Sequence, residues 1–325
     1  MNFEGPFRLH SLLAARFVAT LEQAASPTRP DRLGGRSWVR FSKIRRSDGP
    51  LIFLAAMRQE IIRNQLHQNE KLQLMSPNNH PAIDVTLVCG RRPELLSQTL
   101  QSFQQMVFRH FRIGGVYVNI DPFGGDESDH EKCRSLVLGY FPNAAISEPE
   151  TASFGRAVKV LWSQVKSPLV LHLEDDWLAL ESITPDRVFP LFKGRTRAVK
   201  LVTKELGWNG RDENRRRTEK VKLLGLTIWK RKISSFGTSP AFFSSDFVRR
   251  CSSLLRDDLD PEKQQRSHIN PPLTNFTSRY ECRVLPGVAQ PEIIKDIGRK
   301  WRDERGISKI TERGRSTWSE RRTTE

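Results

Sequence analysis

The stretch Leu169-Val170-Leu171-His172-Leu173-Glu174-Asp175-Asp176-Trp177 decides the fold. It begins as a short, almost wholly apolar run, which is the pattern of a strand buried in a parallel sheet. Three consecutive carboxylates follow that run directly. Negative charges at the end of a buried strand are costly unless a positive group lies among them. The stretch therefore predicts an α/β protein with an acidic site at the end of a strand.

The segments upstream show the same alternation of strand and helix. Residues 83–89 form a β-branched apolar run, and residues 115–120 form another that ends at Asp121. Apolar residues recur at helical spacing between these two runs, at 93–103, and again at 154–165, directly before the acidic strand. A strand, a helix and a strand within about 40 residues form a βαβ unit. We therefore expect a mostly parallel, Rossmann-like sheet flanked by helices.

The acidic residues fall where such sheets bind ligands. In open α/β sheets, ligands bind outside the carboxyl ends of the strands, and Asp121 and the cluster 174–176 both follow a strand. Glu174 and Asp176 lie on the same side of an extended backbone, although a turn could bring Asp175 round instead. Mg²⁺ or Mn²⁺ prefers oxygen ligands and is commonly shared with substrate phosphates. We predict Asp176 and Glu174 as metal ligands; the alternative is an acidic loop that forms surface ion pairs.

These residues resemble the GT-A-fold glycosyltransferases of the broad family-two type, which use nucleotide-diphospho-sugars. The resemblance extends over roughly residues 82 to 310 and is most specific at 174–177, which is similar to the family's Asp-x-Asp position. Three more segments support it: Arg91–Leu96 after the first strand, Thr238–Phe243, and Asp296–Trp301. The resemblance implies a GT-A-like fold and metal-dependent transfer of a hexose, with inversion, from a UDP- or GDP-sugar to an acceptor hydroxyl. The implied acceptor is a glycan, a lipid-linked molecule or a protein.

The resemblance also implies roles for individual residues. The loop after the first strand would lie beside the base and ribose, and Asp121 would contact the base. An arginine of the helix before the acidic cluster would face the diphosphate, unless it is simply an exposed helix residue. A second arginine, near the C-terminus, would close the site over the diphosphate, unless it only ends a helix. The implied nucleotide contacts are Arg91, Arg92, Asp121, Arg156, Glu174, Asp175 and Arg299.

A catalytic base is implied as well, since inverting members use a carboxylate to deprotonate the acceptor hydroxyl. Asp257, Asp258, Asp260 and Glu262 are the acidic candidates. We favour Glu262, which matches a Pro-Glu position in related sequences, and name Asp258 beside it; a helix cap is the alternative for the aspartates. Many members add a C-terminal histidine as a metal ligand. No histidine follows His268 here, so that ligand is either His268 or missing.

Composition divides the chain into three parts. Residues 1–80 contain twelve Lys and Arg against six Asp and Glu and predict a basic, mostly helical extension, used for packing, for a partner or at a membrane surface. Residues 81–310 form the expected glycosyltransferase domain. Residues 311–325 are expected to be a polar tail that frays. Tryptophans 177, 208 and 229 are candidates for stacking on an acceptor, with core packing as the alternative for each.

The formal net charge of +16 indicates an anionic partner: nucleic acid, an anionic membrane or a phosphorylated substrate. The competing function is a nucleic-acid-binding or metal-dependent nucleic-acid-processing protein. No helix-turn-helix, zinc or RNP-like pattern supports it, so we expect no specific nucleic acid. A nucleotidyltransferase and a catalytically silent binding module are further alternatives. Four scattered cysteines and no apolar run of about 18–20 residues favour a cytoplasmic protein, at most peripheral at the inner face of a membrane.

Overall fold

The structure is a computed structural model of the 325-residue chain. It describes residues 80–204, 214–223, 226–266, 268–288, 292–312 and 314–320. Apart from His80, the expected N-terminal extension lies outside the described residues, as does Trp208.

A seven-stranded sheet of the order β10-β6-β9-β4-β1-β2-β3 forms the centre of the fold. β1 lies between β2 and β4 and pairs in parallel with both; β3 and β10 are also parallel to their neighbours. Only β9 is antiparallel, to β4 on one side and β6 on the other. The strands are β1 (Ile83–Cys89), β2 (Ile113–Ile120), β3 (Ala145–Ser147), β4 (Leu169–Glu174), β6 (Thr196–Leu201), β9 (Ala241–Ser244) and β10 (Glu281–Leu285). The α/β, mostly parallel sheet predicted from the sequence is confirmed.

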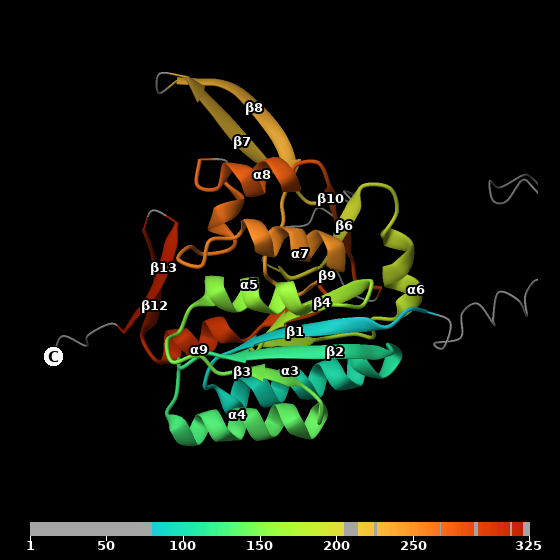
Figure 1. Cartoon of the computed structure of the whole chain (residues 1–325), viewed down its shortest axis with the longest axis vertical. Coiled ribbons are helices and arrows are strands. Elements are labelled where there is room, and N and C mark those ends of the chain that lie inside the picture. Colours follow the sequence, from blue (N-terminus) through green and yellow to red (C-terminus); the bar gives the residue numbers. More distant parts are fainter. Residues whose placement is uncertain are drawn as a thin grey trace, which may run out of the picture. The chain divides into compact units, whose positions relative to one another are not determined.

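Helices cover both faces of this sheet, α3 and α4 on one side and α5 and α7 on the other (Figure 1). The strand side chains alternate between two cores: Val85 and Leu87 belong to one, and Val88 to the other. This alternation explains why β1 is apolar along its whole length. The helices are α3 (Pro93–Met106), α4 (Glu127–Tyr140), α5 (Phe154–Gln164), α6 (Pro185–Val188), α7 (Ser245–Leu254), α8 (Pro271–Thr277) and α9 (Gly298–Glu304), with single 3₁₀ turns at Phe108–His110, Phe189–Leu191 and Lys263–Gln265.

Three strand pairs lie outside the main sheet. β5 (Trp177–Ala179) continues directly from the acidic cluster and pairs with β11 (Ile294–Asp296). β7 (Arg216–Leu223) and β8 (Leu226–Ser234) form a hairpin, and β12 (Ile307–Glu312) and β13 (Arg315–Glu320) form another. The expectation that residues 311–325 fray is therefore wrong for 311–312 and 315–320, because backbone pairing holds these polar strands together. In the part of the chain that the structure describes, no helix has the length and apolar character needed to cross a membrane.

Candidate active site

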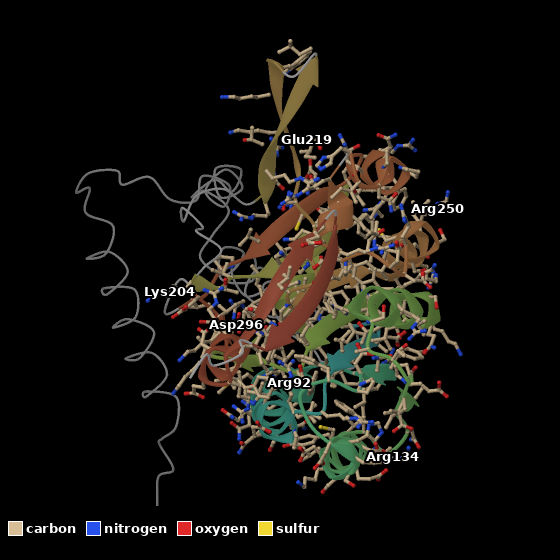
Figure 2. All side chains as sticks on the ribbon, turned by 90° about the vertical axis from the view of Figure 1, so that its left-hand side faces the viewer. Arg92, Arg134, Lys204, Glu219, Arg250 and Asp296 are labelled. Atoms are coloured by element: carbon tan, nitrogen blue, oxygen red, sulfur yellow. The ribbon has the colours of Figure 1, made fainter. Side chains whose placement is uncertain are left out.

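The acidic cluster lies at the carboxyl end of β4, beside the end of β1. Asp175 donates its backbone N–H to Val88 O over 3.1 Å, so the cluster begins while the backbone is still paired to the sheet. After the cluster, β5 leads away to pair with β11. Figure 2 labels Arg92 and Asp296, two of the residues that the chain brings to this region. The predicted location of the acidic site, at the strand ends, is the one observed.

Asp175 is enclosed by Arg92. The Arg92 Nε donates to Asp175 Oδ2 over 3.1 Å, and Nη2 donates to Oδ1. The N–H of Gly90 donates to the same Oδ2 over 2.9 Å. Asp175 is 1% exposed and Arg92 is 7% exposed. Both were predicted to contact the nucleotide, but each side chain is used in this pair and leaves little surface for a ligand. They instead fix the loop after β1 to the end of β4.

Asp176 faces α9. Its Oδ2 accepts from Arg302 Nη1 over 3.2 Å, and its backbone oxygen accepts from Ile297 N over 2.9 Å. A Cβ added to Gly298 would lie only 2.0 Å from this Oδ2, so a glycine is required at the start of α9. Burial raises the pKa of Asp176 to about 6, and the charges of Asp175 and Asp296 add to this effect while Arg92 and Arg302 oppose it.

Glu174 and Glu262 meet at Thr238. The Thr238 side chain hydrogen-bonds to Glu174, and its backbone N–H donates to Glu262 Oε1 over 3.1 Å. Burial raises the pKa of Glu174 well above its ordinary value, and the negative charges of Asp176 and Glu262 raise it further. Glu262 is exposed. Four carboxylates therefore form a line across the site, in which the charge of each affects the pKa of a neighbour. We call them the carboxylate row: Asp296, Asp176, Glu174 and Glu262.

The carboxylate row fits a hard divalent cation. Asp176 and Glu174 supply oxygen donors, which Mg²⁺ and Mn²⁺ prefer. Their raised pKa values record unfavourable negative charge that a cation would offset. Asp175, tied to Arg92, is the acid of the cluster that is least free to bind a metal.

Asp121 is at the end of β2 and is 8% exposed. Its carboxylate accepts from Asn119 Nδ2 over 2.9 Å and from Ser153 N over 3.2 Å. Burial raises its pKa, and these two hydrogen bonds and Arg156 reduce that rise. Arg156 is turned back toward the loop before α5, where its Nη2 donates to Thr151 O over 2.8 Å. Asp121 and Arg156 are thus neighbours at the rim, and both remain predicted nucleotide contacts.

Arg91 and Arg299 lie at the edge of the site. Arg91 forms an ion pair of 2.9 Å with Glu127 at the start of α4. Arg299 has an exposed side chain on α9, and its backbone N–H donates to Asp296 Oδ1 over 3.0 Å. Both arginines remain predicted nucleotide contacts.

Asp258 lies in a different environment from the carboxylate row. Its carboxylate forms ion pairs with Arg256 at 3.1 Å and Arg315 at 3.0 Å, and hydrogen bonds from these arginines lower its pKa. With His268 it lines a cavity of about 1030 Å³ beside the β12–β13 hairpin. A carboxylate held by two arginines is a poor proton acceptor, which weakens the prediction of Asp258 as the base. Glu262 remains the other predicted base.

Several residues of the site were missed in the sequence. Lys200 on β6 is only 8% exposed, and its ammonium forms no hydrogen bond or ion pair with another described residue. A Cβ built on Gly237 would lie 2.8 Å from Lys200 Nζ and 2.7 Å from Glu262 Oε1. The ammonium and the carboxylate are therefore neighbours on either side of Gly237. A lysine inside the apolar run 198–202 was the available signal. Arg302 gave no such signal, because only the fold brings it to Asp176.

A second group of potential metal ligands lies at the start of α4. Among the described residues, Glu127, His130 and Glu131 have ligand atoms within 4.8 Å of one another. However, Glu127 pairs with Arg91, and His130 Nε2 lies 2.9 Å from Glu148 Oε1. These partners explain the cluster without an ion.

No protein-family model and no curated protein matches the chain. Among solved structures, it is similar to mannosyltransferase PcManGT from Pyrobaculum calidifontis with GDP-Man and Mn²⁺, at 12% identity and a TM-score of 0.44, over 68% of this chain and 58% of that one. It is also similar to S. aureus TarS 1-349 with UDP-GlcNAc, at 15% identity and a TM-score of 0.43, over 66% of this chain and 58% of that one. A third similar structure is GalNAc-T7 with UDP, GalNAc and Mn²⁺, at 10% identity and a TM-score of 0.46, over 67% of this chain and 43% of that one. The chain spans less than two thirds of the length of each. Its central sheet, with one antiparallel strand among otherwise parallel ones, is the mostly parallel α/β sheet predicted from the sequence.

Proposed function

We propose that this chain is a metal-dependent glycosyltransferase that moves a sugar from a nucleotide-diphosphate donor to an acceptor hydroxyl. The observation that supports the proposal most is the carboxylate row at the carboxyl end of β4, where two acids have raised pKa values. It lies at the edge of the sheet where α/β proteins bind ligands. Asp121, at the end of β2, is on the same edge and would receive the base of a UDP- or GDP-sugar.

The donor side of the reaction uses Asp176 and Glu174. These carboxylates would hold Mn²⁺ or Mg²⁺, which neutralises charge on the departing diphosphate when bound. Arg302 holds Asp176 in position from α9, at 3.2 Å. Arg299 is exposed one turn earlier on the same helix and would bind a phosphate oxygen.

The acceptor side of the reaction uses Glu262. It is exposed, so an acceptor hydroxyl can reach it, and Thr238 holds it beside Glu174. Glu262 would take the hydroxyl proton as the acceptor oxygen bonds to the anomeric carbon and the bond from that carbon to the diphosphate breaks. Attack from the side opposite the diphosphate inverts the anomeric centre. Lys200, near Glu262, would balance the negative charge gathered there.

Thermal unfolding with nucleotides tests the proposal. UDP, GDP, CDP and their sugars are added to the whole chain with and without Mn²⁺. We expect one nucleotide series to raise the Tm in the presence of Mn²⁺, and the rise to be lost in Asp176→Asn and Glu174→Gln. Glu131→Gln is the matched control, because it removes an acid from the α4 cluster without touching the row. The proposal fails if no nucleotide raises the Tm, or if Glu131→Gln loses the effect and Asp176→Asn keeps it.

A further inference from the structure

The β7–β8 hairpin forms a sheet of its own, separate from both cores. Both views show it extending away from the body beyond α8 (Figures 1 and 2). Its base is attached to the body: Ser234 Oγ donates to Tyr280 O over 2.7 Å, Arg217 donates to Gln265 O, and Ile233 is 9% exposed. The hairpin is therefore a projecting arm with an anchored base.

Large apolar side chains are exposed on this arm. Ile228 is 61% exposed and Trp229 is 70% exposed. Among the described residues only Val288 and Ile310 join them as strongly exposed large hydrophobics, and those two are single positions elsewhere on the surface. Neighbouring residues of a regular strand point to opposite faces, but the register shifts here: Trp229 lies opposite Val221 and Thr227 opposite Lys222, which leaves Ile228 in a bulge between them. Large apolar side chains exposed at this bulge indicate a surface that another apolar medium covers.

The same arm is strongly basic. From Arg215 to Ser234 the sequence contains eight Lys and Arg and one acid, Glu219. The strand register puts Lys220 directly opposite Lys230, and Lys230 and Lys232 are exposed. Like charges at opposite positions of a strand pair disfavour the pairing. Glu219 opposite Arg231 is the one oppositely charged pair in this register, and no acid lies opposite the other basic residues of the arm. An anionic partner is the chemistry that offsets their repulsion.

We propose that the β7–β8 hairpin docks the protein on the surface of an anionic lipid bilayer. Trp229 and Ile228 would enter the interface between headgroups and acyl chains, where tryptophan is enriched. The lysines beside them would contact the anionic headgroups. This docking does not depend on the proposed glycosyl transfer.

A bilayer fits the arm better than a nucleic acid does. Phosphate contacts account for most non-specific binding to nucleic acids and would use the lysines alone. The exposed Ile228 has no role in that binding, since bases stack on aromatic and guanidinium groups. In a bilayer, the apolar pair and the basic residues bind the same surface at once.

Sedimentation of the full chain with lipid vesicles tests the docking. One set of vesicles is phosphatidylcholine, and the other is roughly two parts phosphatidylcholine to one part phosphatidylserine. We expect binding to the mixed vesicles to be about tenfold tighter or more, and to weaken as salt is raised. Lys230→Glu/Lys232→Glu should lose about tenfold in affinity for the mixed vesicles. Ile228→Ser/Trp229→Ser should lose about tenfold or more as well, at any salt concentration.

The control is Lys166→Glu/Arg250→Glu, which makes the same change in net charge at two exposed positions away from the arm. It should bind within about twofold of the wild type. Thermal unfolding checks that every variant is folded. The proposal is overturned if either arm variant binds like the wild type, or if the control loses as much as Lys230→Glu/Lys232→Glu. Duplex DNA that binds through these lysines more tightly than the mixed vesicles would overturn it as well.

Discussion

Arg92 and Asp175 bind each other through two parallel hydrogen bonds at the point where β1 and β4 end. This pair divides the acidic cluster into two functions. Asp175 is satisfied within the protein and fixes the loop at Gly90, whereas Asp176 and Glu174 keep raised pKa values and are the predicted metal ligands. Consecutive residues at the end of β4 thus supply a buried ion pair and the two predicted metal ligands.

The first prediction concerns this buried pair. Asp175→Asn and Arg92→Lys each remove one half of a bidentate contact and leave the other group poorly paired away from water. We expect each to lower the free energy of unfolding by about 3 kcal/mol or more, as measured by urea denaturation. Arg91→Lys, which changes a pair with an exposed glutamate, should cost at most about 1 kcal/mol. Equal effects at Arg91 and Arg92 would contradict the structural importance of the buried pair.

The first half of the domain could be predicted because its signals are local. β1, α3, β2, α5 and β4 each show their own periodicity, and the strand-to-helix alternation fixes how they pair. The acids at the end of β4 followed from the same pattern. α4 was missed because its apolar face is weak: only His130, Cys133 and Val137 are buried along it.

The second half could not be predicted in the same way. β9 is inserted between β4 and β6 across long sequence separations, and no local pattern specifies that neighbour. For the same reason Arg302 was missed, and Asp258 was named as a base beside the favoured Glu262. What separates those two acids is the tertiary contact each makes: Thr238 for Glu262, and Arg256 and Arg315 for Asp258.

The second prediction is a pH dependence at Asp176. Its pKa rises from 3.8 to about 6 on folding, so the folded state binds the proton more tightly. The stability that this pKa difference contributes is fully present below the unfolded pKa of 3.8. It is lost as pH rises through the folded pKa of about 6. Metal-free Asp176→Asn should therefore unfold at a higher Tm than the wild type at pH 7. The difference should shrink toward pH 5.

Added Mn²⁺ should reverse that order at pH 7, because only the wild type keeps the charged ligand. A metal-free variant that is less stable than the wild type at pH 7, or equal gains from Mn²⁺ in both proteins, would count against a metal site at Asp176.

The third prediction separates the two candidate bases. Glu262→Gln should lower kcat by about 10²- to 10⁴-fold, since the acceptor hydroxyl loses its proton acceptor. Binding of the donor nucleotide should persist, because Glu262 is on the acceptor side. Asp258→Asn should leave kcat within about twofold, since this acid is already held by two arginines. Initial rates with saturating donor, alongside nucleotide titrations, give the comparison; the opposite ranking would move the base to Asp258.

The fourth prediction concerns the buried Lys200. Lys200→Met keeps the length of the side chain and removes its charge beside Glu262. We expect kcat/KM to fall about tenfold or more, with Lys200→Arg recovering part of the loss. Lys193→Met, at an exposed position just before β6, is the matched control and should retain full activity. If Lys200→Met is folded and fully active, Lys200 is only a structural residue.

The last prediction concerns Asp84, which ties the amino end of β1 to the segments beside it. Asp84 is fully buried and accepts hydrogen bonds from the backbone of Gly115 and Lys166 and from both the backbone and the hydroxyl of Ser167. Burial alone would raise its pKa, but these hydrogen bonds outweigh burial and lower it. The stability that ionised Asp84 contributes is therefore present above its ordinary pKa of 3.8. It is lost as pH falls through the lower pKa of the folded state. Asp84→Asn turns an amide group toward backbone donors and should cost about 2–4 kcal/mol at neutral pH. The cost should decrease in acid.

Asp246→Asn, with a side chain that is 89% exposed, should cost no more than about 1 kcal/mol and show no such pH trend. Urea denaturation of the three proteins across pH 3 to 7 measures both effects, and a cost at Asp84 that does not change with pH would show that the ionised carboxylate is not what these donors stabilise.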